Sequence, residues 1–248
     1  MRIKERLNQS DFVYGTWCLI PSPEVINILA KAGLDFVLID MEHGAADYVK
    51  AQLMIMAAEA EDCEAIIRVA DNDEASILRA LDIGASGVIV PHIESVEDRE
   101  KAISYMKYPP LGVRGFSPYT RAGGYTSKKK HTVQENERIL TGIIIEGKSG
   151  IKDIGKIIDD PQLDIVYIGT YDLSVSIGVP GDVSHPSVRE ILITCVDEIR
   201  RQGKFAGCLF HNGDELDFFK EIGIQFLAYK VDSKVLYDGF ALINELKG

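Results

Sequence analysis

The chain has 248 residues, of which 46% are apolar and 26% charged, a composition typical of a globular protein with a sizeable core. Its 27 Lys and Arg against 38 Asp and Glu give a net charge of −11, which argues against nucleic acid as a partner because phosphate backbones attract positive charge. The N-terminal residues lack the apolar core of a signal peptide and no apolar run could span a bilayer, so we expect a cytoplasmic protein without membrane contact.

Apolar runs typical of strands alternate with segments of helical periodicity along the whole chain. The expected strands are residues 14–20, 35–40, 64–69, 86–91, 141–146, 164–169, 205–210 and 224–231. Segments between them, such as 23–34 and 47–61, carry apolar residues at helical spacing. This pattern predicts a single (β/α)8 TIM barrel over residues 1–248, with a doubly wound open sheet as the main alternative.

Residues 107–138 interrupt this alternation, because they are too long and too polar for an ordinary connection. The lysines at 128–130 are most simply a solvated face. A basic rim above an anionic substrate is the functional alternative.

Polar residues follow several of the expected strands, and in such a barrel the loops after the strands meet at one pocket. These residues are Asp40, Glu42, His43, Arg68, Glu146, Gly169, Asp172, Lys230 and Asp232. Each one alone has an ordinary structural interpretation, such as a helix cap or an ion pair. Their joint position predicts an active site.

The residue types at this pocket indicate carbonyl chemistry assisted by a metal. Glu146 and Asp172 resemble a hard-cation site with an incomplete set of oxygen ligands, which favours Mg²⁺ or Mn²⁺ over structural zinc. The open positions would bind and polarise a carbonyl. His43 adds a candidate general base, and Arg68 adds a positive charge where an enolate oxygen develops.

Six segments occur in the order seen in the HpcH/HpaI aldolase family, which the chain resembles over nearly its whole length. They are "LIDMEHG", "IIRVADND", "VIVPHI", "YPPLGVRG", "IIIEGKSG" and "YIGTYDLS". The resemblance implies a TIM barrel of the phosphoenolpyruvate/pyruvate-binding type. It also implies a lyase that reversibly cleaves a 4-hydroxy-2-oxo acid to pyruvate and an aldehyde through a metal-bound pyruvate enolate.

The resemblance also assigns roles to individual residues. Glu146 and Asp172 would be the ligands of a divalent metal, Mg²⁺ or Mn²⁺ with Co²⁺ as an alternative. Arg68 would stabilise the enolate oxygen. His43, supported by Asp40, would take the proton from the 4-hydroxyl of the substrate.

Further implied contacts involve the pyruvate carboxylate, the pocket floor and other subunits. Gly169 and Thr170 would hold the carboxylate, and Trp17 would line the floor, although a purely structural indole is an equal alternative. Family members commonly form hexamers, trimers of dimers that exchange their last helix. Residues 233–248 are amphipathic and would serve that exchange or close their own barrel.

The chain departs from the family at several positions. Ile144 replaces a common Gln, and Tyr171 replaces a small residue and would narrow or polarise the aldehyde side of the pocket. Lys230 raises a metal-free alternative, a Schiff-base aldolase, although contact with a substrate carboxylate or a salt bridge to Asp232 or a neighbouring acid is simpler. We expect His92, also atypical, to pack or to bond a backbone carbonyl.

Three other functions remain open on the sequence alone. An acyl-CoA lyase of the citrate lyase beta-subunit type is the nearest enzymatic alternative, and a noncatalytic metabolite-binding barrel belongs to a different class. Residues 142–149 also match the P-loop expression GxxxxGK[ST]. That match is disfavoured because its middle residues form a strand ending in Glu146, which would repel phosphate.

Overall fold

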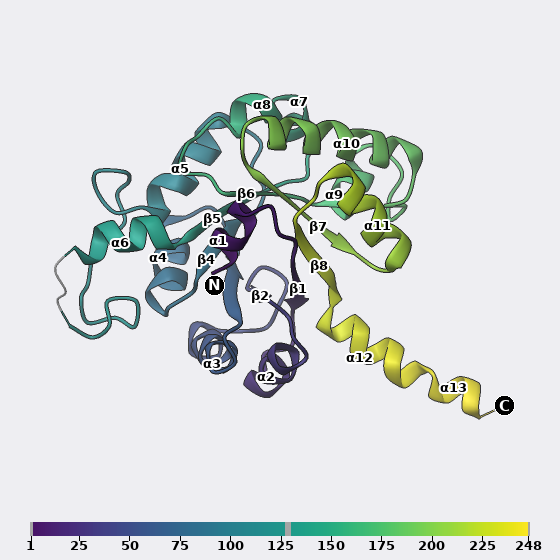
Figure 1. Ribbon diagram of the computed structural model, residues 1–248, viewed down its shortest axis with the longest axis horizontal. Coiled ribbons are helices and arrows are strands. Elements are labelled where there is room, and N and C mark those ends of the chain that lie inside the picture. The colour runs from purple at the N-terminus through teal and green to yellow at the C-terminus, as the bar shows by residue number, and fades with distance from the viewer. Residues whose placement is uncertain (1, 127–129, 248) are drawn as a thin grey trace.

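The computed structural model describes residues 2–126 and 130–247. Its strands are all parallel and close into a barrel in chain order, with β8 hydrogen-bonded to β1 (Figure 1). They are β1 (Val13–Cys18), β2 (Phe36–Asp40), β3 (Glu64–Arg68), β4 (Gly87–Val90), β5 (Leu140–Ile145), β6 (Ile165–Ile168), β7 (Phe205–Phe210) and β8 (Phe226–Val231). Each coincides with a predicted run, so the TIM barrel is confirmed and the open sheet is excluded.

Most of the helices surround the barrel (Figure 1). The helices are α1 (Ile3–Asn8), α2 (Pro23–Lys31), α3 (Tyr48–Glu59), α4 (Glu74–Asp82), α5 (Val96–Met106), α6 (His131–Arg138), α7 (Lys148–Lys152), α8 (Ile154–Ile157), α9 (Thr170–Ser176), α10 (Pro186–Arg201), α11 (Gly213–Ile222), α12 (Asp232–Ala241) and α13 (Ile243–Leu246). Side-chain caps fix where several begin. Asp47 Oδ1 accepts from Lys50 N at 2.7 Å before α3, and Ser95 Oγ accepts from Asp98 N at 3.1 Å before α5.

The core has two parts. One apolar cluster fills the barrel interior, where Phe36 and Phe226 stack with ring centroids 4.0 Å apart. Ile3 and Leu7 of α1 join this cluster, and α1 lies over the middle of the barrel in Figure 1. A larger cluster lies between strands and helices. The interior is therefore packed, and the space for chemistry is at the end where the strands finish.

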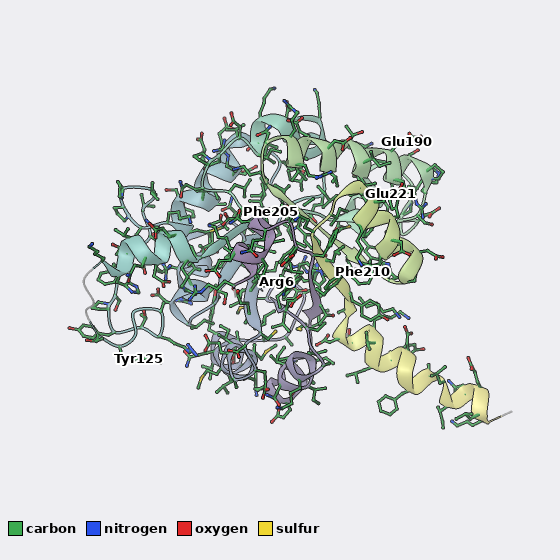
Figure 2. All side chains as sticks on the ribbon, in the orientation of Figure 1. Arg6, Tyr125, Glu190, Phe205, Phe210 and Glu221 are labelled. Atoms are coloured by element: carbon green, nitrogen blue, oxygen red, sulfur yellow. The ribbon has the colours of Figure 1, made fainter. Side chains whose placement is uncertain are left out.

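The connection between α5 and α6 lies at the opposite end of the barrel. Its Arg114 Nη2 is 2.9 Å from Asp82 Oδ1 at the end of α4, and its Arg121 pairs with Glu59 at the end of α3. Those helix ends lead into the N-terminal ends of the next strands. Tyr125 marks this segment at the left of Figure 2. This location disfavours a basic rim above the substrate, although lysines 128 and 129 lie outside the described residues.

The last two helices project away from the barrel (Figure 1). Asp232 at the start of α12 is buried, and its carboxylate accepts from the backbone N–H groups of Leu19 and Ile20, each at 3.0 Å. Tyr237 and Phe240 further along are exposed. Among the described helices, none has both the length and the apolar character needed to cross a membrane.

Candidate active site

A cavity of about 260 Å³ opens at the C-terminal ends of the strands. Its lining consists of Trp17, Leu19, Asp40, His43, Arg68, Ile144, Glu146, Tyr167, Ile168, Gly169, Thr170, Tyr171, Asp172, Leu209 and Val231. Of the polar residues predicted to form the site, all but Glu42, Lys230 and Asp232 are in this set. The structure thus brings together side chains that are more than 150 residues apart in the chain.

The buried Asp40 and the half-buried Arg68 form a pair at the ends of the adjacent strands β2 and β3. Arg68 donates from Nε to Asp40 Oδ1 at 2.9 Å and from Nη2 to Asp40 Oδ2 at 2.6 Å, and its Nη1 lies 3.0 Å from Glu42 Oε2. The guanidinium lies 4.6 Å from the ring centroid of Trp17. Burial opposes its charge, but the hydrogen bond to Asp40 and the nearby carboxylates raise the pKa of Arg68, which keeps it cationic.

His43 stands at the exposed edge of the cavity, with its side chain 64% accessible. Asp40, the acid expected to support its imidazole, instead accepts from the backbone N–H groups of Glu42 and His43 at 3.0 and 3.2 Å. The carboxylate nearest the imidazole is that of Glu42, with Oε1 3.7 Å from Nε2. Asp40 therefore holds Arg68 and the loop backbone, and Glu42 faces the ring.

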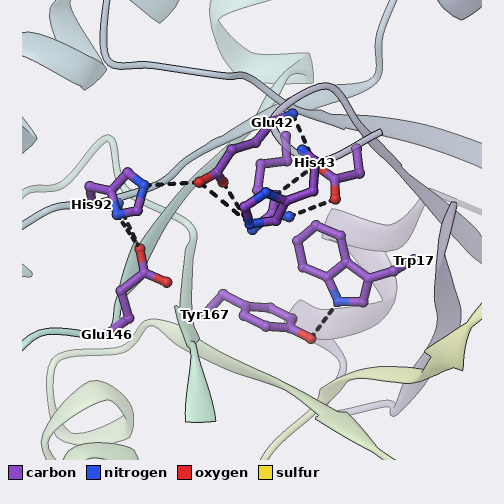
Figure 3. Close-up of polar contacts among 8 residues, drawn as sticks. Trp17, Glu42, His43, His92, Glu146 and Tyr167 are labelled. Carbon is purple, nitrogen blue, oxygen red and sulfur yellow. Dashed lines mark hydrogen bonds and ion pairs between the residues drawn. The ribbon is translucent and has the colours of Figure 1, made fainter. Parts of the chain in front are cut away.

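His92 joins two of the carboxylates around the cavity mouth. Its Nε2 lies 2.9 Å from Glu42 Oε1, and its Nδ1 lies 2.7 Å from Glu146 Oε1, as Figure 3 shows. Its backbone N–H also donates to Glu146 Oε1 at 3.1 Å. The left-handed backbone of His92, with φ of 58°, allows this placement. The expectation that it bonds a backbone carbonyl or only packs was therefore wrong.

Glu146 is buried directly after β5. Burial raises the pKa of its carboxyl, the charge of His92 lowers it, and the negative charges of Asp172 and Glu42 raise it further. A Cβ on Gly169 would lie 2.7 Å from Glu146 Oε2, so glycine is needed there for this close approach. Two carboxylates from neighbouring strands thus crowd one wall of the cavity.

Gly169 and Thr170 lie where β6 passes into α9. The N–H of Gly169 already donates to Ile145 O at 3.2 Å. Amides in the first turn of a helix, beginning with Thr170, have no carbonyl partner within the helix and can donate to a ligand. Of these two residues, both predicted to contact the pyruvate carboxylate, Thr170 is better placed because its N–H has no partner within the helix.

Trp17 and Tyr167 form the floor of the cavity. Trp17 Nε1 donates to the Tyr167 hydroxyl at 2.8 Å, and the two rings meet edge to face (Figure 3). The indole is both a satisfied core residue and a lining residue, so the two interpretations of Trp17 are compatible. Ile144 shares the cavity face with Glu146, as the two-residue period of a strand predicts.

Lys230 lies apart from this group, and its Nζ is 3.4 Å from Asp238 Oδ2 on α12. A hydrogen bond to the side chain of Tyr229 is the main cause that raises the pKa of Lys230. A Schiff-base lysine needs an amine whose pKa is lowered, so this environment disfavours the metal-free alternative. Of the sequence-based accounts, a salt bridge to a neighbouring acid fits the structure.

Two histidines of the cavity mouth were missed as functional candidates. His92 follows β4 closely, and His211 directly follows β7 and contacts Tyr171 of the cavity wall. A polar residue just after a strand was the signal used for the other strands. Applied to these two strands, the same signal identifies both histidines.

The model of the HpcH/HpaI aldolase/citrate lyase family matches residues 14–238. The chain belongs to this family. The hydroxypyruvate/pyruvate aldolase of Paraburkholderia phytofirmans is 31% identical over 236 residues, which cover 93% of this chain and 91% of that protein. The 4-hydroxy-2-oxo-heptane-1,7-dioate aldolase of Klebsiella pneumoniae is 30% identical over 91% of this chain and 85% of its own length.

Solved structures agree with this assignment. The HpcH/HpaI aldolase of Desulfitobacterium hafniense superposes with a TM-score of 0.93 at 28% identity, covering 99% of this chain and 96% of the other. The prediction of an aldolase of the HpcH/HpaI family is therefore confirmed, and it is favoured over an acyl-CoA lyase and a noncatalytic barrel.

Proposed function

We propose that this HpcH/HpaI family aldolase reversibly cleaves a 4-hydroxy-2-oxo acid to pyruvate and an aldehyde, using His43, Arg68, Glu146 and Asp172. The observation that supports this most is their joint position: a base, a half-buried cation and two carboxylates line one cavity. Relatives that are named pyruvate aldolases support pyruvate as one product of the cleavage.

A divalent cation, Mg²⁺ or Mn²⁺ with Co²⁺ as an alternative, fits Glu146 and Asp172. Their oxygen donors suit a hard cation, and the raised pKa of Glu146, which burial causes and the neighbouring carboxylates increase, indicates negative charge that a cation would relieve. When bound, such an ion would polarise the 2-oxo group and stabilise negative charge on its oxygen. Within the described residues, no cluster of three or more His, Cys, Asp and Glu side chains is arranged to hold a metal, so the proposed set is these two acids.

The protein residues would divide the cleavage step between them. His43 takes the proton from the 4-hydroxyl, and the C3–C4 bond breaks as the aldehyde carbonyl forms. The electron pair of that bond moves into the pyruvate enolate, whose oxygen faces the Arg68 guanidinium. His43, which is exposed to solvent, releases its proton there, and a solvent proton adds to C3 to give pyruvate. Asp40 keeps Arg68 in place through both of its carboxylate oxygens.

We also propose that the chain forms a homo-oligomer, by resemblance a hexamer built as a trimer of dimers. The C-terminal helices carry the support for this. Leu236, Phe240, Leu242, Ile243 and Leu246 are exposed on a segment that projects from the barrel. An apolar surface of this kind is typical of a subunit contact.

The function is tested by aldol synthesis, the reverse reaction. Metal-stripped protein is incubated with pyruvate and a short aldehyde, with and without Mg²⁺ or Mn²⁺, and the 4-hydroxy-2-oxo acid is detected by mass spectrometry. We expect product only with metal, and none with Glu146→Gln, which keeps the side-chain size but removes the charge. Product formed equally well after chelation would contradict the proposed metal-assisted reaction.

A further inference from the structure

A second group of polar side chains extends from the cavity wall on the side of β7. The Tyr171 hydroxyl lies 2.8 Å from His211 Nε2, and His211 Nδ1 lies 2.9 Å from Glu215 Oε2. The same Glu215 oxygen accepts from the His211 backbone N–H at 2.8 Å. Glu215 is itself in the first turn of α11, where its backbone N–H donates to Asn212 Oδ1 at 2.9 Å. Tyr171, His211 and Glu215 therefore form a chain of hydrogen bonds that is also bonded to the backbone.

The order of donors and acceptors along this row follows from its chemistry. An ionised carboxylate only accepts, so the proton on His211 belongs on Nδ1, which faces Glu215. In the neutral imidazole, Nε2 is then an acceptor, and the Tyr171 hydroxyl donates to it. The phenol proton is therefore engaged in the hydrogen bond to His211. What Tyr171 offers to a neighbouring molecule is the lone pairs of its oxygen, which accept a hydrogen bond.

The position of Tyr171 assigns it to the aldehyde half of the substrate. Trp17, Thr170 and the proposed metal ligand Glu146, which would hold the pyruvate half, are all buried, whereas the second ligand Asp172 is exposed. Tyr171 is 49% exposed and lies at the solvent side, as does the base His43. A ligand that fills the floor with its pyruvate part must extend its other half past these two residues.

We propose that Tyr171, positioned by His211 and Glu215, selects aldehydes that carry a hydroxyl group beside the carbonyl. The substrate hydroxyl would donate to the Tyr171 oxygen. A carboxylate or phosphate in the same place has no proton to donate and would meet an acceptor, so anionic aldehydes are disfavoured there. This inference rests on the proposed aldol reaction and names the class of its second substrate.

The test compares two aldehydes of similar size in aldol synthesis with pyruvate, glycolaldehyde and propionaldehyde, which differ by a hydroxyl in place of a methyl. The measured quantity is the ratio of their kcat/KM values in each variant. Because both react with the same enolate, partial unfolding or slow enolate formation cancels from this ratio. For Tyr171→Phe we expect the ratio to fall about 2- to 12-fold, the effect of one neutral hydrogen bond.

Further variants separate selection from general damage. Tyr119→Phe removes the hydroxyl of another exposed tyrosine, on the segment at the opposite end of the barrel, and should leave the ratio unchanged. His211→Ala should lower the ratio through a higher KM for glycolaldehyde alone. His211→Gln, whose side-chain oxygen can accept from Tyr171, should restore part of the ratio that His211→Ala loses.

The outcomes distinguish the inference from the function beneath it. An unchanged ratio in Tyr171→Phe, or an equal fall in Tyr119→Phe, would overturn the inference while leaving the aldolase intact. Absence of product from both aldehydes in the wild type, together with no exchange of pyruvate methyl protons in D2O, would overturn the proposed function and this inference with it.

Discussion

The guanidinium of Arg68 is held on two sides by carboxylates and above by an indole, so its direction is fixed before any substrate arrives. The two shorter contacts of Arg68 are with the carboxylate oxygens of Asp40, which is only 1% exposed. An uncompensated charge in such a place is costly, because the partner left behind cannot be solvated. Stability and catalysis therefore both depend on this pair.

Asp40→Asn should lower the free energy of unfolding by about 3 kcal/mol, because it removes the buried carboxylate that holds Arg68 through two hydrogen bonds and leaves Glu42 as its charged partner. Urea denaturation followed by circular dichroism measures this. The matched control is Asp153→Asn, which breaks the exposed pair with Lys156 and should have no measurable effect. Similar losses in both variants would show that burial of the Asp40 pair has no special importance.

The pH dependence of stability should reflect Glu146. Burial raises the pKa of its carboxyl above the ordinary 4.5, so the folded protein binds this proton more tightly than the unfolded chain does. Stability from this group is present at low pH and is lost as pH rises through the folded-state pKa. In chelator, Glu146→Gln should therefore gain stability relative to the wild type between pH 4 and pH 7. A relative loss over that range would contradict the sign of this shift.

At the scale of elements, strand positions were predictable and contacts between loops were not. Buried runs such as "FVLID" are apolar on both faces because helices cover a parallel sheet outside and side chains fill the barrel inside. Acids such as Asp40 and Glu146 mark the ends of some of these runs. The contact of His92 with two carboxylates depends on a left-handed backbone at that residue, which no periodicity in the sequence reveals.

The pairing of Tyr171 with His211 illustrates the same limit. The two residues are 40 positions apart and meet because β6 and β7 are neighbours in the barrel. The sequence indicated that a bulky Tyr171 would alter the aldehyde side of the pocket. It did not identify the partner that orients the hydroxyl.

The C-terminal helices give a prediction at this scale. Phe240→Asp places a charge on the exposed apolar face of α12. It should lower the number of subunits in the oligomer, as measured by sedimentation velocity. Val49→Asp on α3 alters another exposed apolar residue away from this segment and should leave the mass unchanged. An unchanged mass in Phe240→Asp would contradict a subunit contact through α12.

At the scale of the whole molecule, the apolar barrel interior and the candidate active site occupy different parts of the barrel. The aromatic and aliphatic interior and α1 fill the centre and one end, while the charged residues of the candidate site gather at the other end. This division is why the fold and the general location of the site followed from the sequence. The roles of individual residues could not be predicted, because Asp40, Glu42 and His92 each pair with a side chain at or just after the end of a different strand.

The most direct test of the central claim follows the methyl protons of pyruvate in D2O by NMR, with metal-stripped protein, with and without Mn²⁺ or Mg²⁺. Exchange reports enolate formation and requires no knowledge of the aldehyde. We expect exchange that depends on metal and is abolished by Glu146→Ala, with Lys230→Ala resembling the wild type. Exchange that persists without metal and requires Lys230, or no exchange under any condition, would contradict the account.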